Sequence, residues 1–194
     1  MLNEILKNHK LILASGSPRR HQFFKDLGLA FTVRTKDVDE VYPDQLQGAE
    51  ISDYLAQLKA NAQKDTLEPN EILITSDTVV LLDDECLGKP KDRDEALAMI
   101  RSLSGRSHRV VTSVCFSSIE KQITENCTTK VSFKDLSDTE IAYYVDHYKP
   151  YDKAGAYGIQ EWIGATAITH IEGSYNNVMG LPTHLVYNIL SNWD

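Results

Sequence analysis

The sequence predicts one α/β domain with a mixed sheet, covering residues 1–194. Strand-like and helix-like segments alternate along the chain, and no Pro/Gly/Ser-rich linker, low-complexity tract or internal repeat divides them. Two strand-like runs, 110–118 and 123–133, are joined by the short polar segment 117–121, as in a hairpin. Because a hairpin pairs its strands antiparallel, the sheet is not expected to be purely parallel.

The first half of the chain predicts two strands, each followed by a helix. The first strand is 11–14, and Pro18 suits the first turn of the following helix, where its missing N–H costs nothing. Gly28 is placed to end that helix. The second strand is 31–35, and an amphipathic helix follows, with Lys59 near one border of its buried face. The residues expected on that face are Ile51, Leu55, Leu58 and Ala62.

The second half predicts further helices and two loops rich in glycine and polar residues. Asp92 with Glu95, and Ser137 with Glu140, have the spacing of helix N-caps. Loops are expected where glycines permit backbone angles that other residues avoid. The predicted segments are, in order, helix 92–103, helix 137–148, loop 155–160, loop 173–182 and a closing helix 182–190.

Composition and charge exclude several classes of protein. The three cysteines lack C-x-x-C spacing and are odd in number, which fits neither a disulfide framework nor a zinc site and indicates a reducing compartment. No apolar run approaches the roughly 18 residues that span a bilayer, and the N-terminus is charged where a signal peptide would be apolar. We therefore expect a cytoplasmic protein with no membrane partner. The net charge of -8 argues against general nucleic-acid binding.

The segment Ser15-Gly16-Ser17-Pro18-Arg19-Arg20 combines several features that favour a bound phosphate. It joins a strand end to a helix N-terminus through small residues that let the backbone approach a ligand. Backbone N–H groups, the helix dipole and two guanidinium groups would each attract phosphate oxygens. The pattern alone is equally compatible with an ordinary strand-to-helix turn whose arginines are solvated. It is not a P-loop, because G-x-x-x-x-G-K-[ST] is absent.

Asp77 stands in the polar triplet 76–78, between the strand-like runs 72–74 and 79–82. A carboxylate in such surroundings is expected at a strand end or in a cleft, where burial without a partner would cost several kcal/mol. We therefore expect a metal, a lysine or hydrogen-bond donors beside it. The alternative is a turn aspartate in a tight hairpin.

Three further charged residues are weaker candidates. Glu40 closes the acidic cluster 37–40, which suits hard cations such as Mg²⁺ or Mn²⁺, although most such clusters are solvated loops. Lys59 and Lys89 are single lysines of the kind usually found on a wet surface, but Lys89 lies between Gly88 and Pro90 in a rigid turn. The six histidines lack metal-pair spacing, and no G-x-S-x-G segment supports a serine nucleophile.

Taken in order, these motifs resemble one family, the Maf proteins, also called septum formation inhibitor proteins, which are nucleoside triphosphate pyrophosphatases. The resemblance runs from near residue 11 to beyond residue 182. The matching segments are Leu13 to Arg20, Asp37 to Glu40, Leu55-Ala56 with Lys59-Ala60, Ser76 to Val80, Gly88 to Pro90, Leu103 to Arg106 with His108, Asp152 to Gln160, and Gly173 to Pro182.

The resemblance implies a two-lobed α/β fold of the Maf/ITPase type. This fold has a mixed, twisted central sheet flanked by helices, an active site in the cleft and often a homodimeric assembly. The resemblance also implies that Asp77 is the catalytic acid/base and that Glu40 and Asp77 hold the metal. The residues expected to bind the substrate are Ser15, Ser17, Arg20, Lys59 and Lys89. The residues at the specificity positions are Arg19, Thr78 and Gln160, which this chain shares with the branch acting on dTTP and UTP.

The expected reaction is hydrolysis of dTTP or UTP to the nucleoside monophosphate and pyrophosphate, including house-cleaning of non-standard pyrimidine nucleotides. We expect attack of water at the α-phosphorus with Mg²⁺ or Mn²⁺ as the cofactor. A free aspartate has a pKa of about 3.9, so Asp77 alone matches water poorly and the metal is expected to supply most of the activation. We also expect neighbouring groups to fix the Gln160 amide, because a flipped amide would serve cytosine as well as uracil.

Two alternatives stay open from the sequence. The first is a Maf-like pyrophosphatase directed at purine or modified nucleotides. The second is a nucleotide-binding regulator of cell division with little catalysis, which would not need Asp77 in an activating position.

Overall fold

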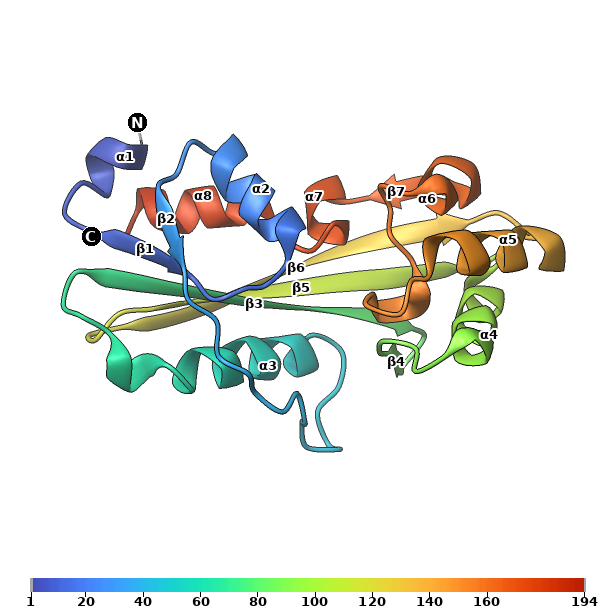
Figure 1. The fold of residues 1–194 in the computed structure, drawn as a ribbon, viewed down its shortest axis with the longest axis horizontal. Coiled ribbons are helices and arrows are strands. Elements are labelled where there is room, and N and C mark those ends of the chain that lie inside the picture. The colour runs from blue at the N-terminus through green and yellow to red at the C-terminus, as the bar shows by residue number, and fades with distance from the viewer. Residues whose placement is uncertain (1, 194) are drawn as a thin grey trace. The chain divides into compact units, whose positions relative to one another are not determined.

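The computed structural model describes residues 2–193, which fold into alternating strands and helices (Figure 1). Within this range, a 7-stranded sheet has the order β2-β1-β3-β5-β6-β7, and β4 pairs with β3. The strands are β1 Lys10–Leu13, β2 Phe31–Val33, β3 Glu71–Leu82, β4 Glu85–Leu87, β5 Ser107–Ser117, β6 Gln122–Phe133 and β7 Ile168–Glu172. The helices are α1 Leu2–Ile5, α2 Pro18–Asp26, α3 Ala49–Asn61, α4 Arg93–Leu103, α5 Asp138–Tyr148, α6 Trp162–Ala167, α7 Tyr175–Val178 and α8 Thr183–Ser191, with short 3₁₀ helices η1 Lys64–Thr66 and η2 Ala154–Ala156.

The sheet is mixed, as the sequence predicted. Strand β1 pairs in parallel with both β2 and β3, so that Leu11 lies opposite Phe31 on one side and Ile72 on the other. Strand β4 pairs antiparallel with β3, and β7 pairs antiparallel with β6. The predicted fold class, an α/β fold with a mixed sheet flanked by helices, is therefore confirmed.

The chain divides into two compact units. Unit 1 contains the residues up to Asp77, Thr112–Cys127 and the residues from Gly180 onward, and unit 2 contains Thr78–Val111 and Thr128–Met179. The boundaries fall inside β3, β5 and β6, so each of these strands contributes residues to both units. The single domain predicted over residues 1–194 stays a prediction.

In unit 1, helix α3 covers one face of the sheet, while α2 and α8 cover the other (Figure 1). Helix α1 packs against α8. Ala56 and Ala60 of α3 are fully buried against Leu73 of β3, because their small side chains let the helix approach the strand closely. The predicted buried face is therefore partly wrong, since Leu58 and Ala62 are only half-buried.

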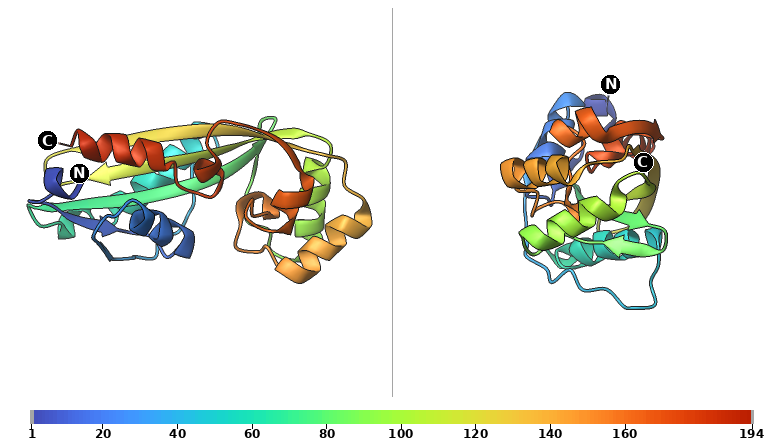
Figure 2. Two further views of the ribbon diagram at one scale, coloured as in Figure 1. Left: turned by 90° about the horizontal axis from the view of Figure 1, so that it is seen from above. Right: turned by 90° about the vertical axis from the view of Figure 1, so that its right-hand side faces the viewer.

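In unit 2, helices α4 and α5 pack against each other (Figure 2). Both begin at the predicted caps: Asp92 Oδ1 accepts a hydrogen bond from Glu95 N at 2.9 Å, and Ser137 with Glu140 forms a complete capping box. The unit has its own hydrophobic core, which includes Ile100 of α4, Tyr144 of α5, Val131 of β6 and Ile163 of α6.

Other parts of the fold also differ from the prediction, which included neither α1 nor β4. The polar triplet 76–78 does not separate two strands, because β3 continues through it as a 12-residue strand. The region between the two predicted loops contains α6 and β7, and the second loop contains α7. Strand β7 is placed by its pairing with β6, which is distant in sequence, so short-range patterns gave little sign of it. Within residues 2–193, no helix is both long and apolar enough to cross a membrane.

Candidate active site

Asp77 lies inside β3 and is only 8% exposed. It is therefore neither at a strand end nor in a hairpin turn, and the third environment expected from the sequence, a cleft, stays a prediction. Backbone pairing and burial of the neighbouring Ile, Leu and Val residues outweigh the weak strand propensity of Ser and Asp. The consequence is a carboxylate held at a fixed place on the sheet, with the partner that its burial requires.

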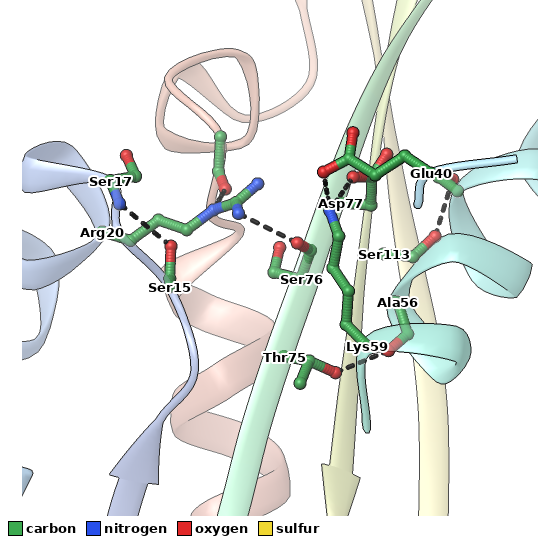
Figure 3. A network of polar contacts seen from close by, with 12 residues as sticks. Ser15, Ser17, Arg20, Glu40, Ala56, Lys59, Thr75, Ser76, Asp77 and Ser113 are labelled. Carbon is green, nitrogen blue, oxygen red and sulfur yellow. Dashed lines mark hydrogen bonds and ion pairs between the residues drawn. The ribbon is translucent and has the colours of Figure 1, made fainter. Parts of the chain in front are cut away.

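The partner of Asp77 is Lys59 of α3, as Figure 3 shows. Lys59 Nζ lies 2.5 Å from Asp77 Oδ1 and 2.9 Å from Glu40 Oε1, so that one ammonium contacts both carboxylates. The Lys59 and Asp77 side chains are 18% and 11% exposed, whereas that of Glu40 is 41% exposed. Three residues singled out from the sequence are thus brought together, from α3, β3 and the segment between β2 and α3.

A hydrogen bond between α3 and β3 sets the position of Lys59. Thr75 Oγ1, fully buried, donates to the carbonyl oxygen of Ala56 at 2.6 Å (Figure 3). Thr75 precedes Asp77 by two residues and therefore shares its face of the strand, and Lys59 follows Ala56 by three residues on the helix. Thr75 was not predicted from the sequence, although strand alternation could have placed it on the face of Asp77.

The loop before α2 forms a compact turn. Ser15 is buried, and its Oγ accepts a hydrogen bond from Ser17 N at 3.2 Å. Pro18 is the first residue of α2 and Gly28 follows its end in the left-handed region, as predicted. Ser17, the N-cap residue, makes no side-chain capping bond.

Arg20 of α2 is tied to the backbone of two segments that are distant in sequence. Its Nε donates to Gly180 O at 2.8 Å and its Nη1 to Ser76 O at 2.9 Å, so the guanidinium lies beside the residue that precedes Asp77 (Figure 3). Burial lowers the pKa of Arg20 from its ordinary value, while the negative charges of Asp77 and Glu40 oppose that effect. Arg20 stays charged, because arginine does not lose its proton in proteins. Arg19 is half-buried.

Three candidate residues belong to unit 2. Thr78 follows Asp77 in β3 and is half-buried. Lys89 is exposed in its turn, and this turn is tied to the loop beginning at Gly155 by a backbone hydrogen bond from Gly155 N to Gly88 O at 3.0 Å. The structure therefore joins the Lys89 turn to the segment that ends at Gln160.

Gln160 is exposed, and among residues 2–193 none forms a hydrogen bond with its side-chain amide. The expectation that neighbouring groups of the protein fix this amide is thus not met within the described chain. What is fixed is the backbone on either side of it: Gly158 N donates to Tyr144 Oη at 3.0 Å, and Glu161 N donates to Gly158 O at 3.0 Å.

A buried polar network surrounds that backbone. Tyr144 Oη donates to Glu161 Oε2 in a short hydrogen bond, and Lys153 Nζ lies 3.2 Å from Glu161 Oε1. Burial, and then the bond to Glu161, raise the pKa of Tyr144, which keeps its hydroxyl protonated as a donor. The network was not predicted from the sequence, because Tyr144 and Glu161 are 17 residues apart and no local motif connects them.

His108, which the sequence led us to treat as structural, is buried in unit 2. Its Nε2 lies 2.7 Å from Tyr157 Oη, and its ring packs edge-on against Phe133 and Tyr157. Burial lowers the pKa of His108 to about 4, so the ring is neutral near pH 7. A neutral, enclosed imidazole of this kind is part of the core.

Glu40 and Asp77 are the residues that could hold a metal ion. Their carboxylate oxygens are the donors that Mg²⁺ and Mn²⁺ prefer. Across residues 2–193, no group of three or more His, Cys, Asp or Glu side chains is arranged to hold a metal. Mg²⁺ commonly binds through one or two carboxylates together with substrate phosphates and water. The pair therefore fits a divalent ion shared between protein and nucleotide.

Comparison with known proteins shows the family to which this chain belongs. Residues 10–193 match the family model described as Maf-like protein. The dTTP/UTP pyrophosphatase of Flavobacterium johnsoniae is 58% identical over 98% of each chain, and that of Flavobacterium psychrophilum is 57% identical over 99% of this chain and 98% of the relative. Among solved structures, the Staphylococcus aureus Ham1 protein aligns with a TM-score of 0.49 and 18% identity over 65% of this chain and 72% of that chain. By the family model and these identities, the chain belongs to the Maf-like protein family.

Proposed function

We propose that this chain hydrolyses dTTP and UTP to the nucleoside monophosphate and pyrophosphate. Near full-length relatives that bear the name dTTP/UTP pyrophosphatase support this substrate class. The observation that carries the proposal is the contact of Lys59 with both Asp77 and Glu40. A buried carboxylate, a second carboxylate and an ammonium in one cluster can accept a proton and neutralise a polyphosphate.

In this proposal Asp77 is the catalytic acid/base. Its carboxylate would orient a water molecule toward the α-phosphorus and accept a proton as the new P–O bond forms. The bond from the α-phosphorus to the bridging oxygen breaks, and pyrophosphate leaves with that oxygen. The position of Asp77 inside a strand supports this role, because a general base must hold its geometry relative to the reacting atom.

We propose Mg²⁺ or Mn²⁺ as the cofactor, with Glu40 and Asp77 as its protein ligands. A bound divalent ion would lower the pKa of coordinated water and offset charge on the phosphates. The hard oxygen donors of both residues support this choice of metal.

The triphosphate would be bound by cationic groups and by the loop before α2. Arg20 and Lys59 offer positive charge beside Asp77, and the turn at Ser15 and Ser17 leads into the N-terminus of α2, whose helix dipole favours an anion. Lys89 is assigned the same role on the strength of the family motif alone. Such local positive charge explains how a chain of net charge -8 could bind a polyanion.

Arg19, Thr78 and Gln160 are proposed as the residues that select uracil and thymine. The Gln160 amide offers one donor and one acceptor, which complement O4 and N3–H of these bases. Because the protein itself leaves that amide without a partner among residues 2–193, the base would have to orient it. Acceptance of both dTTP and UTP requires that neither the thymine methyl nor the ribose 2′-OH be read stringently.

The remaining aspects of the proposal concern the cellular setting. We propose a cytoplasmic enzyme that removes non-standard pyrimidine nucleotides and acts as a homodimer. Three free cysteines are consistent with a reducing compartment. Light scattering of the purified protein tests the dimer, which rests on the family resemblance alone.

The decisive experiment is pyrophosphate release from a panel of canonical and modified nucleoside triphosphates, with Mg²⁺ and with Mn²⁺. Asp77→Asn is compared with Asp65→Asn, which removes an exposed carboxylate in η1 of the same unit. We expect activity on dTTP and UTP, a loss of turnover of about 10²- to 10⁴-fold in Asp77→Asn, and no change in Asp65→Asn.

Each other outcome has a defined meaning. Near-normal turnover in Asp77→Asn would refute the assignment of the catalytic residue. A preference for purine or modified nucleotides would replace the proposed substrate. Nucleotide binding without pyrophosphate release across the whole panel would favour a regulatory role in its place.

A further inference from the structure

The cation that contacts Glu40 and Asp77 in this structure is the protein's own Lys59 ammonium. Its Nζ lies 2.5 Å from Asp77 Oδ1 and 2.9 Å from Glu40 Oε1, on the two carboxylates to which the proposed function assigns a divalent metal (Figure 3). The same lysine is also assigned to the triphosphate. Lys59 therefore has two roles: it pairs with the carboxylates in this structure, and in the proposed function it binds the triphosphate.

These two roles conflict on electrostatic grounds. A divalent ion bound by Glu40 and Asp77 would have to share these two carboxylates with the ammonium, which already contacts one oxygen of each. An ammonium left at hydrogen-bond distance from the same oxygens would also repel the ion strongly, because the Lys59 and Asp77 side chains are only 18% and 11% exposed and solvent screens them poorly.

Lys59 is also difficult to displace without a replacement partner. Its helix packs on β3 through Ala56 and Ala60 and is tied to it by the buried hydrogen bond from Thr75 to Ala56, so we expect the ammonium to move mainly through its own side-chain torsions. A half-buried ammonium that leaves two carboxylates needs another anion, or it loses favourable interactions without compensation. A triphosphate is such an anion, with several oxygens that accept from lysine.

We propose that Lys59 is a resident counter-ion that makes metal binding conditional on the nucleotide. Without nucleotide, Lys59 neutralises Glu40 and Asp77 and keeps divalent ions from binding there. When a triphosphate binds, Lys59 transfers its contacts to phosphate oxygens and releases the carboxylates for the metal that accompanies the nucleotide. This inference rests on the proposed function, and it adds an order to the binding events. Since coupling between two ligands is reciprocal, the metal also strengthens nucleotide binding by the same factor.

The test is Mn²⁺ binding to the nucleotide-free protein, measured by electron paramagnetic resonance of free Mn²⁺. Lys59→Met removes the ammonium and keeps a side chain of similar length, whereas Lys59→Arg keeps the positive charge. Lys64→Met is the control, because it removes one exposed lysine five residues further along unit 1. We expect the Lys59→Met protein to bind Mn²⁺ roughly tenfold or more tightly than the wild type, with Lys59→Arg and Lys64→Met close to the wild type.

A double variant locates the ion. Adding Asp77→Asn to Lys59→Met should abolish the gain in affinity, because one of the two carboxylate ligands is lost. Circular dichroism checks the fold of each variant, and Lys59→Gln replaces Lys59→Met if the latter does not fold. Equal affinity in the wild type and the folded Lys59 variant would overturn the inference, as would an equal gain in Lys64→Met or a gain that persists with Asp77→Asn.

This outcome is separable from that of the proposed function. Mn²⁺ binding is measured without nucleotide and without turnover, whereas the proposed activity is judged by pyrophosphate release, which involves no Lys59 variant. An active wild type whose Lys59→Met variant gains no affinity would refute the counter-ion role and leave the activity standing. A wild type that releases no pyrophosphate would refute the activity, even if the binding comparison came out as expected.

Discussion

The carboxylate cluster of unit 1 and the Gln160 segment of unit 2 are built in opposite ways. In unit 1 the candidate side chains contact one another directly, with Lys59 joining Asp77 and Glu40. In unit 2 a buried network holds the backbone around Gln160, while the Gln160 amide is exposed and has no partner among residues 2–193. The charged groups are thus paired with one another by the fold, whereas the amide that we propose to recognise the base has no such partner within residues 2–193.

The physical reason for this difference is the cost of burial. A carboxylate that is almost buried must be paired, since an unpaired charge in a poorly solvated place is strongly destabilising. An exposed amide remains hydrogen-bonded to water at no such cost. The difference leads to three predictions. Each concerns a change in one unit that should leave the properties of the other unit unaltered.

The largest effect is expected from pH, through His108 in unit 2. Its pKa is about 4 in the folded protein against an ordinary value of 6.5, so between these values the unfolded chain binds the proton more readily. The contribution of the neutral His108 ring to the free energy of unfolding should therefore be fully present above about pH 6.5. The free energy of unfolding should fall by on the order of 3 kcal/mol as the pH drops to about 4. Urea denaturation at several pH values measures this change.

The matched variants for this measurement are His108→Gln, which cannot titrate, and His170→Gln, which removes an exposed histidine from the same unit. The acid-induced loss should be smaller in His108→Gln and unchanged in His170→Gln. An identical pH dependence in His108→Gln and the wild type would show that this ring does not couple protonation to folding.

A smaller effect is expected from Tyr144→Phe, which removes the hydroxyl that accepts from Gly158 N and donates to Glu161. Leaving these groups without that partner should lower the free energy of unfolding by about 2 kcal/mol.

Because the Gln160 segment would then be held less firmly, we also expect the ratio of kcat/KM for UTP to kcat/KM for CTP to become smaller. Tyr148→Phe is the control, because that tyrosine stacks on Tyr144 but is exposed. Unchanged base selection in Tyr144→Phe would separate the network from specificity.

The smallest effect is expected from Thr75→Val in unit 1. The variant keeps the shape of the side chain but loses the hydrogen bond to Ala56, at a cost of about 1 kcal/mol. Because α3 would then be held less firmly on β3, we expect kcat for dTTP to fall while the UTP over CTP ratio stays the same. Thr75→Ser, which retains a hydroxyl, should recover most of the activity. A change in base selection in Thr75→Val would contradict the proposal that only the Gln160 segment selects the base.

Local chemistry explains which elements could be predicted from the sequence. The caps at Asp92 and Ser137 and the stop at Gly28 depend on atoms within about four residues, so their patterns are complete in a short window. The runs that became β5 and β6 are long, alternate in part and are joined by a short polar segment, which indicates two strands without reference to distant partners. The predicted mixed sheet followed from these signals.

Elements whose position depends on distant partners were predicted poorly. The triplet 76–78 looked like an interruption, but it lies within β3, whose pairing and burial keep the strand continuous. Strand β7 is held by β6. The buried face of α3 is shifted toward Ala56 and Ala60 because the closeness of β3 favours small residues there, which periodicity alone does not reveal.

By itself, the sequence determined the set of candidate residues and the family, because both depend on the identity and order of residues along the chain. The tertiary structure decided how those residues are connected. Lys59 looked like an ordinary surface lysine, yet it contacts Asp77, 18 residues away, because a hydrogen bond fixes α3 on the face of β3 that carries Asp77. Contacts of this kind depend on packing between elements, and no local pattern in the chain encodes them.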